Sequence, residues 1–170
     1  ESTDEGQTWT ETLVNPTAAE TVWLQEPALL DLGMDRMVLQ IRTADEASPS
    51  SPGKLLQSIS VDGGETWTNW ESFSFVGHAP DLLQLENGVL VSAFREINDE
   101  FTMEWVSFMH SVTDSATWSP VQRIEYCGAA ECGYPSLVEL PGDKLFIAYY
   151  TAGGATIDAV IYDFTVGYAN

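Results

Sequence analysis

The sequence predicts an all-β fold, a β-propeller of four-stranded antiparallel blades, of which the chain supplies about three. Two repeated patterns predict it. The first is a polar turn that ends in tryptophan: "STDEGQTW" at 2–9, "SVDGGETW" at 60–67 and "SVTDSATW" at 111–118. The second is a pair of apolar runs joined by a Gly, Asp or Asn turn, at 26–43, 79–96 and 134–151. Periods near 50 residues, with several short strands in each, are typical of propeller blades.

The strands can be placed in order along a single domain, residues 1–170. Residues 10–15 follow a polar turn and are expected to form a lone outer strand. Residues 26–75 supply a four-stranded blade, and residues 79–126 supply another. Residues 134–166 supply three strands, a blade to be completed by the N-terminal strand of a partner copy or by missing sequence.

Composition limits the classes of function. The chain has 6 Lys and Arg against 26 Asp and Glu, a net charge of -20, so it cannot neutralise the phosphates of a nucleic acid. Its 44% hydrophobic content distinguishes it from a disordered acidic tail. No apolar run is long enough to cross a membrane. The acidic surface favours an extracellular or secreted protein.

Two cysteines, Cys127 and Cys132, lie in "YCGAAECGYP". The small residues between them allow a disulfide-closed loop in an oxidising compartment, and a pair of free thiols is the alternative. Neither His78 nor His110 lies near them in the sequence, so we expect no metal site and no cofactor.

The S-x-D-x-G-x-T-W turns resemble Asp-boxes, and segments such as "GYPSLVELPGDKLFIAYY" resemble the BNR-repeat, sialidase-like (neuraminidase-like) proteins. The resemblance covers nearly the whole chain. The third turn departs from the pattern, with Thr113 in place of Asp and Ser115 in place of Gly. The resemblance implies a six-bladed propeller, of which this chain is the C-terminal half, with the Asp-boxes on the rim away from the active site.

The turns are therefore expected to be structural. An aspartate at the third position can accept N–H bonds of its own turn, glycine supplies backbone freedom, and the indole packs between outer strands. The residues with these roles are Ser2, Asp4, Gly6, Trp9, Ser60, Asp62, Gly64, Trp67 and Trp118.

The opposite rim is expected to carry the chemistry. Arg42, Arg95 and Tyr150 each lie fifteen positions after the proline that begins a repeat. Equivalent positions on adjacent blades project alike, so the two arginines should converge on one cleft. A guanidinium pair suits a carboxylate through charge-assisted hydrogen bonds. Alternatively, both arginines only pair with neighbouring acidic residues and hold loops.

The resemblance also implies three arginines that hold the carboxylate of sialic acid, a Tyr–Glu nucleophile pair and an Asp acid. The first arginine and the Asp would belong to N-terminal blades outside this chain. The candidate catalytic residues here are Glu26, Tyr134 and Tyr150. The candidate substrate-binding residues are Arg42, Arg95, Tyr149 and His78, the last of which is expected in a loop before Pro80.

Two functions of different class follow. The first is a sialidase-like exo-glycosidase, or a fragment of one, that acts on a glycan with an acidic sugar. The missing catalytic elements count against turnover by this chain alone. The alternative is a non-catalytic propeller module that binds a glycan or assembles with itself. The strand count favours a twofold homodimer of six blades, ahead of a fragment of a longer chain or a filament.

Overall fold

The computed structural model describes residues 2–14, 22–45, 53–98, 100, 102–128 and 131–164. Their regular structure is β, apart from one short 3-10 turn, η1 (Ala152–Gly154). The strands are β1 (Val22–Gly33), β2 (Arg36–Asp45), β3 (Lys54–Ser60), β4 (Glu71–Gln84), β5 (Leu90–Ile97), β6 (Glu104–Ser111), β7 (Gln122–Gly128), β8 (Gly133–Leu140), β9 (Lys144–Thr151) and β10 (Thr156–Asp163). The all-β expectation is confirmed.

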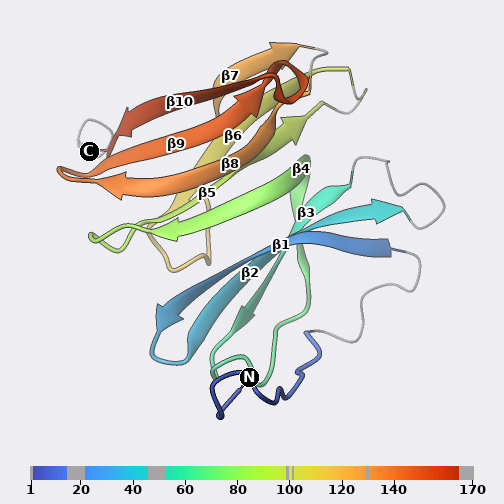
Figure 1. Cartoon of the computed structure of the whole chain (residues 1–170), viewed down its shortest axis with the longest axis vertical. Coiled ribbons are helices and arrows are strands. Elements are labelled where there is room, and N and C mark those ends of the chain that lie inside the picture. The colour runs from blue at the N-terminus through green and yellow to red at the C-terminus, as the bar shows by residue number, and fades with distance from the viewer. Residues whose placement is uncertain are drawn as a thin grey trace.

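Every strand pairs antiparallel with its neighbour in the chain, except that β7 and β8 lie in different sheets. One sheet has the order β1 to β7, and the other contains β8, β9 and β10. The long strand β4 explains why the first sheet is continuous. Its residues 71–76 pair with β3 and its residues 76–84 pair with β5, so it runs between the two groups of strands in Figure 1. The expected boundary between residues 75 and 79 therefore lies inside one strand, and the described sheets do not close into a ring.

The segment expected as a lone strand at residues 10–15 differs from the prediction. Residues 10–14 form no strand and are largely exposed, and residue 15 lies outside the described residues. A strand needs a partner for its backbone N–H and C=O groups. No described edge of this chain pairs with this segment, so the segment stays irregular despite its β-type sequence.

Apolar side chains form two clusters, each between groups of strands. A small cluster lies between the β1–β3 group and the β5–β6 group, and consists of Leu55, Phe94 and Met109 with Phe73, Phe75, Trp118 and Val121 packed against it. The larger cluster lies between β5, β6 and the second sheet, and includes Val91, Ala93, Val106, Phe108, Leu145, Ile147, Tyr149 and Phe164. These clusters hold the sheets face to face and set how their ends meet.

A buried chain of polar groups crosses the smaller cluster. The amide oxygen of Gln40 accepts a hydrogen bond from Ser92 (2.6 Å), and its amide nitrogen donates to the oxygen of Gln57 (3.3 Å). Gln57 then accepts from the indole of Trp118 (3.0 Å) and donates to the carbonyl of Ser115 (3.2 Å). Buried amides are tolerated when they are hydrogen-bonded, so this chain ties β2, β3 and β5 to the third polar turn.

The first two polar turns have the same internal hydrogen bonds. In the second, the Asp62 carboxylate accepts from the backbone N–H of Thr66 (2.8 Å), from its hydroxyl and from Ser60 (2.8 Å). In the first, Asp4 accepts the matching bonds from Thr8 and Ser2. These bonds lower the pKa of both aspartates, with the hydroxyl bond from the threonine as the largest cause. Both carboxylates are thus occupied by their own turn.

The third turn keeps the geometry without the aspartate. The hydroxyl of Thr113 accepts from the N–H of Thr117 (2.9 Å), and Ser111 accepts from the N–H of Ser115 (3.1 Å). The tryptophans differ more. Trp118 packs edge-on against Phe73, but Trp9 is 71% exposed, because the residues after it form no strand for it to pack on. The expectation of a packed indole is therefore wrong for Trp9.

Replacing Asp62 with alanine is expected to lower the Tm by a few degrees at pH 7, because the turn loses its carboxylate acceptor. The pKa of Asp62 is lowered in the fold, so this stabilisation is present above the ordinary pKa of 3.8 and is lost as the pH falls through the folded value. Thermal unfolding measured against pH checks both points. Glu65→Ala, on the same turn, is the control. Equal Tm values for the wild type and Asp62→Ala at pH 7 would contradict the structural role.

Candidate functional site

The residues before the three repeat prolines, Glu26, Ala79 and Tyr134, share an unusual backbone conformation. Their φ angles are 54°, 48° and 46°, in the left-handed region that non-glycine residues rarely adopt. Each lies at a break in strand register, between Gln25 and Ala28, His78 and Asp81, or Gly133 and Ser136. Such a backbone conformation lowers the stability of the fold by roughly 1–3 kcal/mol, and it persists where the surrounding structure holds it, commonly at functional sites.

The three bulges meet at one place. A cavity of about 330 Å³ is lined by residues of all three bulges: Glu26, Pro27, Ala79, Pro80, Asp81, Tyr134, Pro135 and Ser136. The last paired residues before the three bulges are Gln25, His78 and Gly133. Opposite them, on the next strand of each hairpin, lie Arg42, Arg95 and Tyr150, respectively. The sequence spacing predicted this equivalence. The repeats thus bring three pre-proline residues and three partner residues to one end of the sheets.

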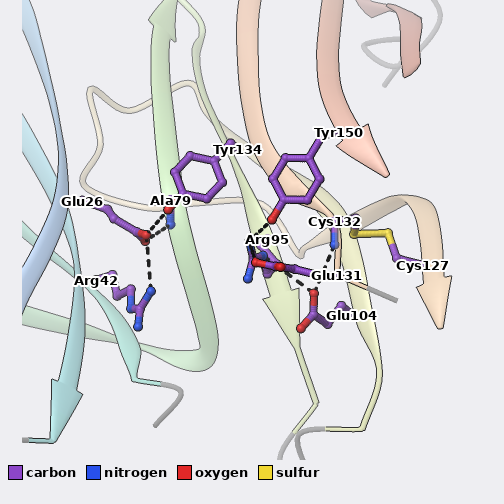
Figure 2. A network of polar contacts seen from close by, with 10 residues as sticks. All are labelled: Glu26, Arg42, Ala79, Arg95, Glu104, Cys127, Glu131, Cys132, Tyr134 and Tyr150. Carbon is purple, nitrogen blue, oxygen red and sulfur yellow. Dashed lines mark hydrogen bonds and ion pairs between the residues drawn. A yellow bond between two sulfur atoms is a disulfide. The ribbon is translucent and has the colours of Figure 1, made fainter. Parts of the chain in front are cut away.

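Glu26 connects three of these positions (Figure 2). Its carboxylate accepts a hydrogen bond from the Tyr134 hydroxyl (2.5 Å), an ion-pair contact from Arg42 (3.3 Å) and the backbone N–H of Ala79 (2.9 Å). Burial acts to raise the pKa of Glu26, but the Tyr134 bond, the charge of Arg42 and the Ala79 N–H outweigh it and hold the pKa below its usual range. Glu26 is therefore a carboxylate at neutral pH, placed to accept a proton from Tyr134.

Tyr134 and Tyr150 flank Arg95. Their rings are stacked with centroids 5.9 Å apart, and the Arg95 guanidinium carbon lies 5.8 Å from the Tyr134 centroid and 5.9 Å from that of Tyr150. The hydrogen bond to Glu26 raises the pKa of Tyr134, with burial as the second cause. Tyr134 is thus a neutral phenol, 54% exposed, that points its hydroxyl at a carboxylate base.

Arg95 is surrounded more closely than Arg42. One of its terminal nitrogens donates to the Tyr150 hydroxyl (2.6 Å) and to Glu131 (3.1 Å), and its Nε lies 3.8 Å from Glu104. Gly133 packs directly against it. A Cβ at this glycine would lie 2.7 Å from Arg95 Nε and 3.1 Å from Arg95 Cβ, and the Gly133 φ of 137° also suits glycine. The absence of a side chain at this position allows Arg95 to reach the site.

His78 and Tyr149 do not lie where the sequence suggested. His78 is expected in a loop but lies in β4, buried, and its Nε2 accepts the N–H of Gly53 (3.2 Å). Burial, followed by the charges of Arg42 and Arg95, lowers its pKa to about 4, so it is neutral at pH 7. Tyr149 is 5% exposed within the larger apolar cluster, because neighbouring residues of a strand point to opposite faces. The structure therefore places Tyr149 in the core, away from Tyr150.

Three residues of the site were not identified from the sequence. Glu104 and Glu131 contact Arg95, and their positions carry no repeat signal. Asp81 lines the cavity directly after Pro80, so comparison of the three proline positions could have found it. Burial raises the pKa of Asp81, although its carboxylate accepts the N–H groups of Leu137 (2.8 Å) and Leu82 (3.1 Å). Asp81 thereby joins β4 to β8.

The cysteine pair is bonded: a disulfide joins Cys127 to Cys132 with 6.0 Å between their Cα atoms. Of the two alternatives, the disulfide is confirmed. The N–H of Cys132 donates to Glu104 (3.3 Å), so the loop borders the Arg95 site. Among the described residues, no three His, Cys, Asp or Glu side chains are grouped to hold a metal ion. No helix in the described part of the chain has the length and apolar character to span a membrane.

Replacing Gly133 with alanine is expected to displace Arg95, since the new Cβ overlaps its side chain. The Nε–H resonance of Arg95 should shift or broaden in NMR spectra while the fold persists. Gly142→Ala is the matched control, because Gly142 also has a positive φ, 82°, but a Cβ there meets nothing within 4 Å. Identical Arg95 signals in Gly133→Ala and Gly142→Ala would show that this close packing does not position the arginine.

A family of proteins that contain a BNR repeat-like domain matches residues 1–147 of the chain. No curated protein matches the sequence. Among solved structures, a protein of unknown function from Dyadobacter fermentans is similar, with a TM-score of 0.73 and 25% identity. The alignment covers 94% of this chain and 43% of that one.

Two enzymes of known name are also similar in fold. The Hadza microbial sialidase Hz136 has a TM-score of 0.73 and 16% identity, over 95% of this chain and 37% of the sialidase. The α-L-arabinanase of Penicillium chrysogenum, solved with arabinobiose, has a TM-score of 0.60 and 20% identity, over 81% of this chain and 45% of the arabinanase. The chain therefore spans less than half of each of these structures.

Proposed function

Because the chain belongs to the family of proteins with a BNR repeat-like domain, we propose that it forms half of a six-bladed glycan-acting propeller and carries part of a sialidase-like active site. The substrate class is a glycan with an acidic sugar. One observation carries the proposal: the Tyr134 hydroxyl is hydrogen-bonded to the Glu26 carboxylate at 2.5 Å, with Arg42 on one side and Arg95 on the other. This set of residues matches the Tyr–Glu pair and two of the three arginines implied by the sequence resemblance.

The proposed chemistry starts at the phenol. Tyr134 attacks the anomeric carbon as Glu26 takes its proton, and the bond to the leaving group breaks. The acid in the other half of the propeller protonates the leaving group, and a covalent glycosyl–tyrosine results. Water then displaces the tyrosine and gives a proton back to that acid, while the tyrosine recovers its own proton from Glu26. Two displacements give net retention of configuration. The lowered pKa of Glu26 keeps it ionised and ready to act as the base.

A neutral nucleophile suits an anionic substrate, because a carboxylate nucleophile would repel the acidic sugar. Arg42 and Arg95 are the proposed partners of the sugar carboxylate, through charge-assisted hydrogen bonds. His78, which lies opposite Arg95 in the strand pairing and is neutral, is proposed to border the arginines without adding charge. Tyr150 is proposed to hold Arg95 in place. The third arginine and the acid for the leaving group are assigned to the remaining half of the propeller.

The same proposal includes the location. A disulfide persists in an oxidising compartment, and an acidic surface of net charge -20 suits an extracellular protein. The chain is therefore proposed to act outside the cytosol on extracellular glycans.

Tyr134→Phe is expected to lower kcat on an aryl sialoside by about 10³-fold or more, because no other residue replaces the nucleophile. Glu26→Gln should also lower kcat strongly, because it removes the base that takes the Tyr134 proton. The measurement is hydrolysis by the full-length protein, with product configuration followed by NMR. Tyr126→Phe is the control, because Tyr126 is an exposed tyrosine that packs at a tilt against Trp105 outside the site. Undiminished turnover in both site variants would refute the nucleophile pair.

The alternative, a non-catalytic module that binds a glycan or assembles with itself, is favoured by the free side of β10. β10 lies at the edge of its sheet and exposes Ile157 (75%) and Ile161 (55%). Residues 10–14, expected as an outer strand, belong to neither of the described sheets. In a twofold dimer, this segment of each copy would pair with β10 of the other and complete six blades.

Light scattering tests the assembly. The exchanged dimer predicts twice the 18.7 kDa mass of the chain at micromolar concentration. Ile157→Glu should shift the mass towards the monomer, because it places a charge on the covered edge. Glu65→Gln, on the second polar turn, should leave the mass unchanged. A folded wild-type monomer at these concentrations would exclude the exchanged dimer.

A further inference from the structure

Arg95 has two carboxylates around one guanidinium, and the two differ in their surroundings. Glu104 is 22% exposed in its side chain and also accepts the N–H of Cys132 (3.3 Å). Glu131 is 58% exposed and contacts Nη2 of Arg95 at 3.1 Å. One carboxylate is enough to neutralise the guanidinium. Glu104 is the less exposed of the two and is also held by the Cys132 N–H, whereas Glu131 is largely exposed; Figure 2 shows both beside Arg95.

The Glu131 contact can be exchanged at small cost. Exposed ion pairs contribute little to stability, because water solvates both charges when they part. The Tyr150 hydroxyl accepts a hydrogen bond from the same Nη2 atom of Arg95 at 2.6 Å. Burial, followed by the nearby Glu131 carboxylate, raises the pKa of Tyr150 to about 12, so its O–H stays protonated and can donate to a carboxylate there. A ligand carboxylate at the position of the Glu131 carboxylate would receive the same two donors, the Arg95 N–H and the Tyr150 O–H.

The backbone of Glu131 is fixed close to Arg95. Its carboxylate therefore competes with a ligand carboxylate for the same donors. Its neighbour Cys132 is fully buried and bonded to Cys127. Its own carbonyl accepts the N–H of Gly153 at 2.8 Å. A tethered group has a high effective concentration, and this concentration falls when the tether is lengthened. The disulfide therefore keeps the Glu131 carboxylate close to Arg95.

We propose that Glu131 is a built-in occupant of the anion-binding position on Arg95, and that the need to displace it determines how strongly the site prefers acidic over neutral ligands. A ligand carboxylate must replace Glu131, whereas a neutral glycan need not. The inference rests on the proposed function in taking an acidic sugar as the ligand of Arg95. It adds a specificity-determining residue outside the strands that carry the repeat, and gives the disulfide a part in ligand selection.

Acetate is the first probe, because it offers a carboxylate without any sugar. Glu131→Gln is expected to bind acetate about three- to tenfold more tightly than the wild type, followed by the Arg95 Nε–H resonance in NMR titrations. The affinity for N-acetylneuraminate should rise by a similar factor in Glu131→Gln. The affinity for its methyl ester, which lacks the negative charge, should not rise. Glu65→Gln removes the same charge from the second polar turn and controls for net charge.

A second variant tests the tether. The variant Cys127→Ala/Cys132→Ala should also bind acetate more tightly than the wild type. When it is combined with Glu131→Gln, the acetate affinity should be little higher than in Glu131→Gln alone. Equal acetate affinities in the wild type and Glu131→Gln, or no acetate binding at Arg95 in either, would overturn the inference. Tighter acetate binding in Glu131→Gln together with no glycosidase activity in the full-length protein would instead reject the proposed function and leave the role of Glu131 intact.

Discussion

The site depends on a backbone constraint that is repeated three times. Glu26, Ala79 and Tyr134 each precede a proline and each lie in the left-handed region at a β-bulge. A bulge of this kind places its first residue in the left-handed region, whereas a following proline disfavours α-type conformations, so the strand pairing on both sides must hold the bulge in place. The strain redirects one side chain per repeat into the shared cavity, where an ordinary strand would alternate its side chains between faces.

Both arginines of the site are paired with carboxylates of the protein itself. Arg42 and Arg95 lie among Glu26, Glu104 and Glu131, and His78 is neutral. Largely buried guanidinium groups need such partners, because an unpaired buried charge is strongly unfavourable. Under the proposed function, anion binding at this site would be an exchange of carboxylates. The local arrangement matters more for this exchange than the net charge of -20, which salt screens beyond about 10 Å.

The candidate site and the polar turns lie at opposite ends of the strands. Arg42 pairs with Leu55 near the start of β3, whereas Met37 pairs with Ser60, where the second polar turn begins. The polar turns saturate their own aspartates and, through Trp118 and Ser115, anchor the buried glutamine chain. In the third turn, the hydroxyl of Thr113 takes over the acceptor role of the aspartate, and this turn does not line the cavity.

The sequence by itself determined the features that arise from short-range contacts. The hydrogen bonds of the polar turns span four residues or fewer, and the hairpins join neighbouring runs, so both could be predicted from spacing. The equivalence of Arg42, Arg95 and Tyr150 followed from the same repeat. Only the tertiary structure joined Tyr134 to Glu26, 108 residues apart, placed Glu131 on Arg95, and turned Tyr149 into the core while Tyr150 faces the site. These outcomes depend on strand register and on how the sheets pack, and a shift of one residue in register would reverse which tyrosine faces the site.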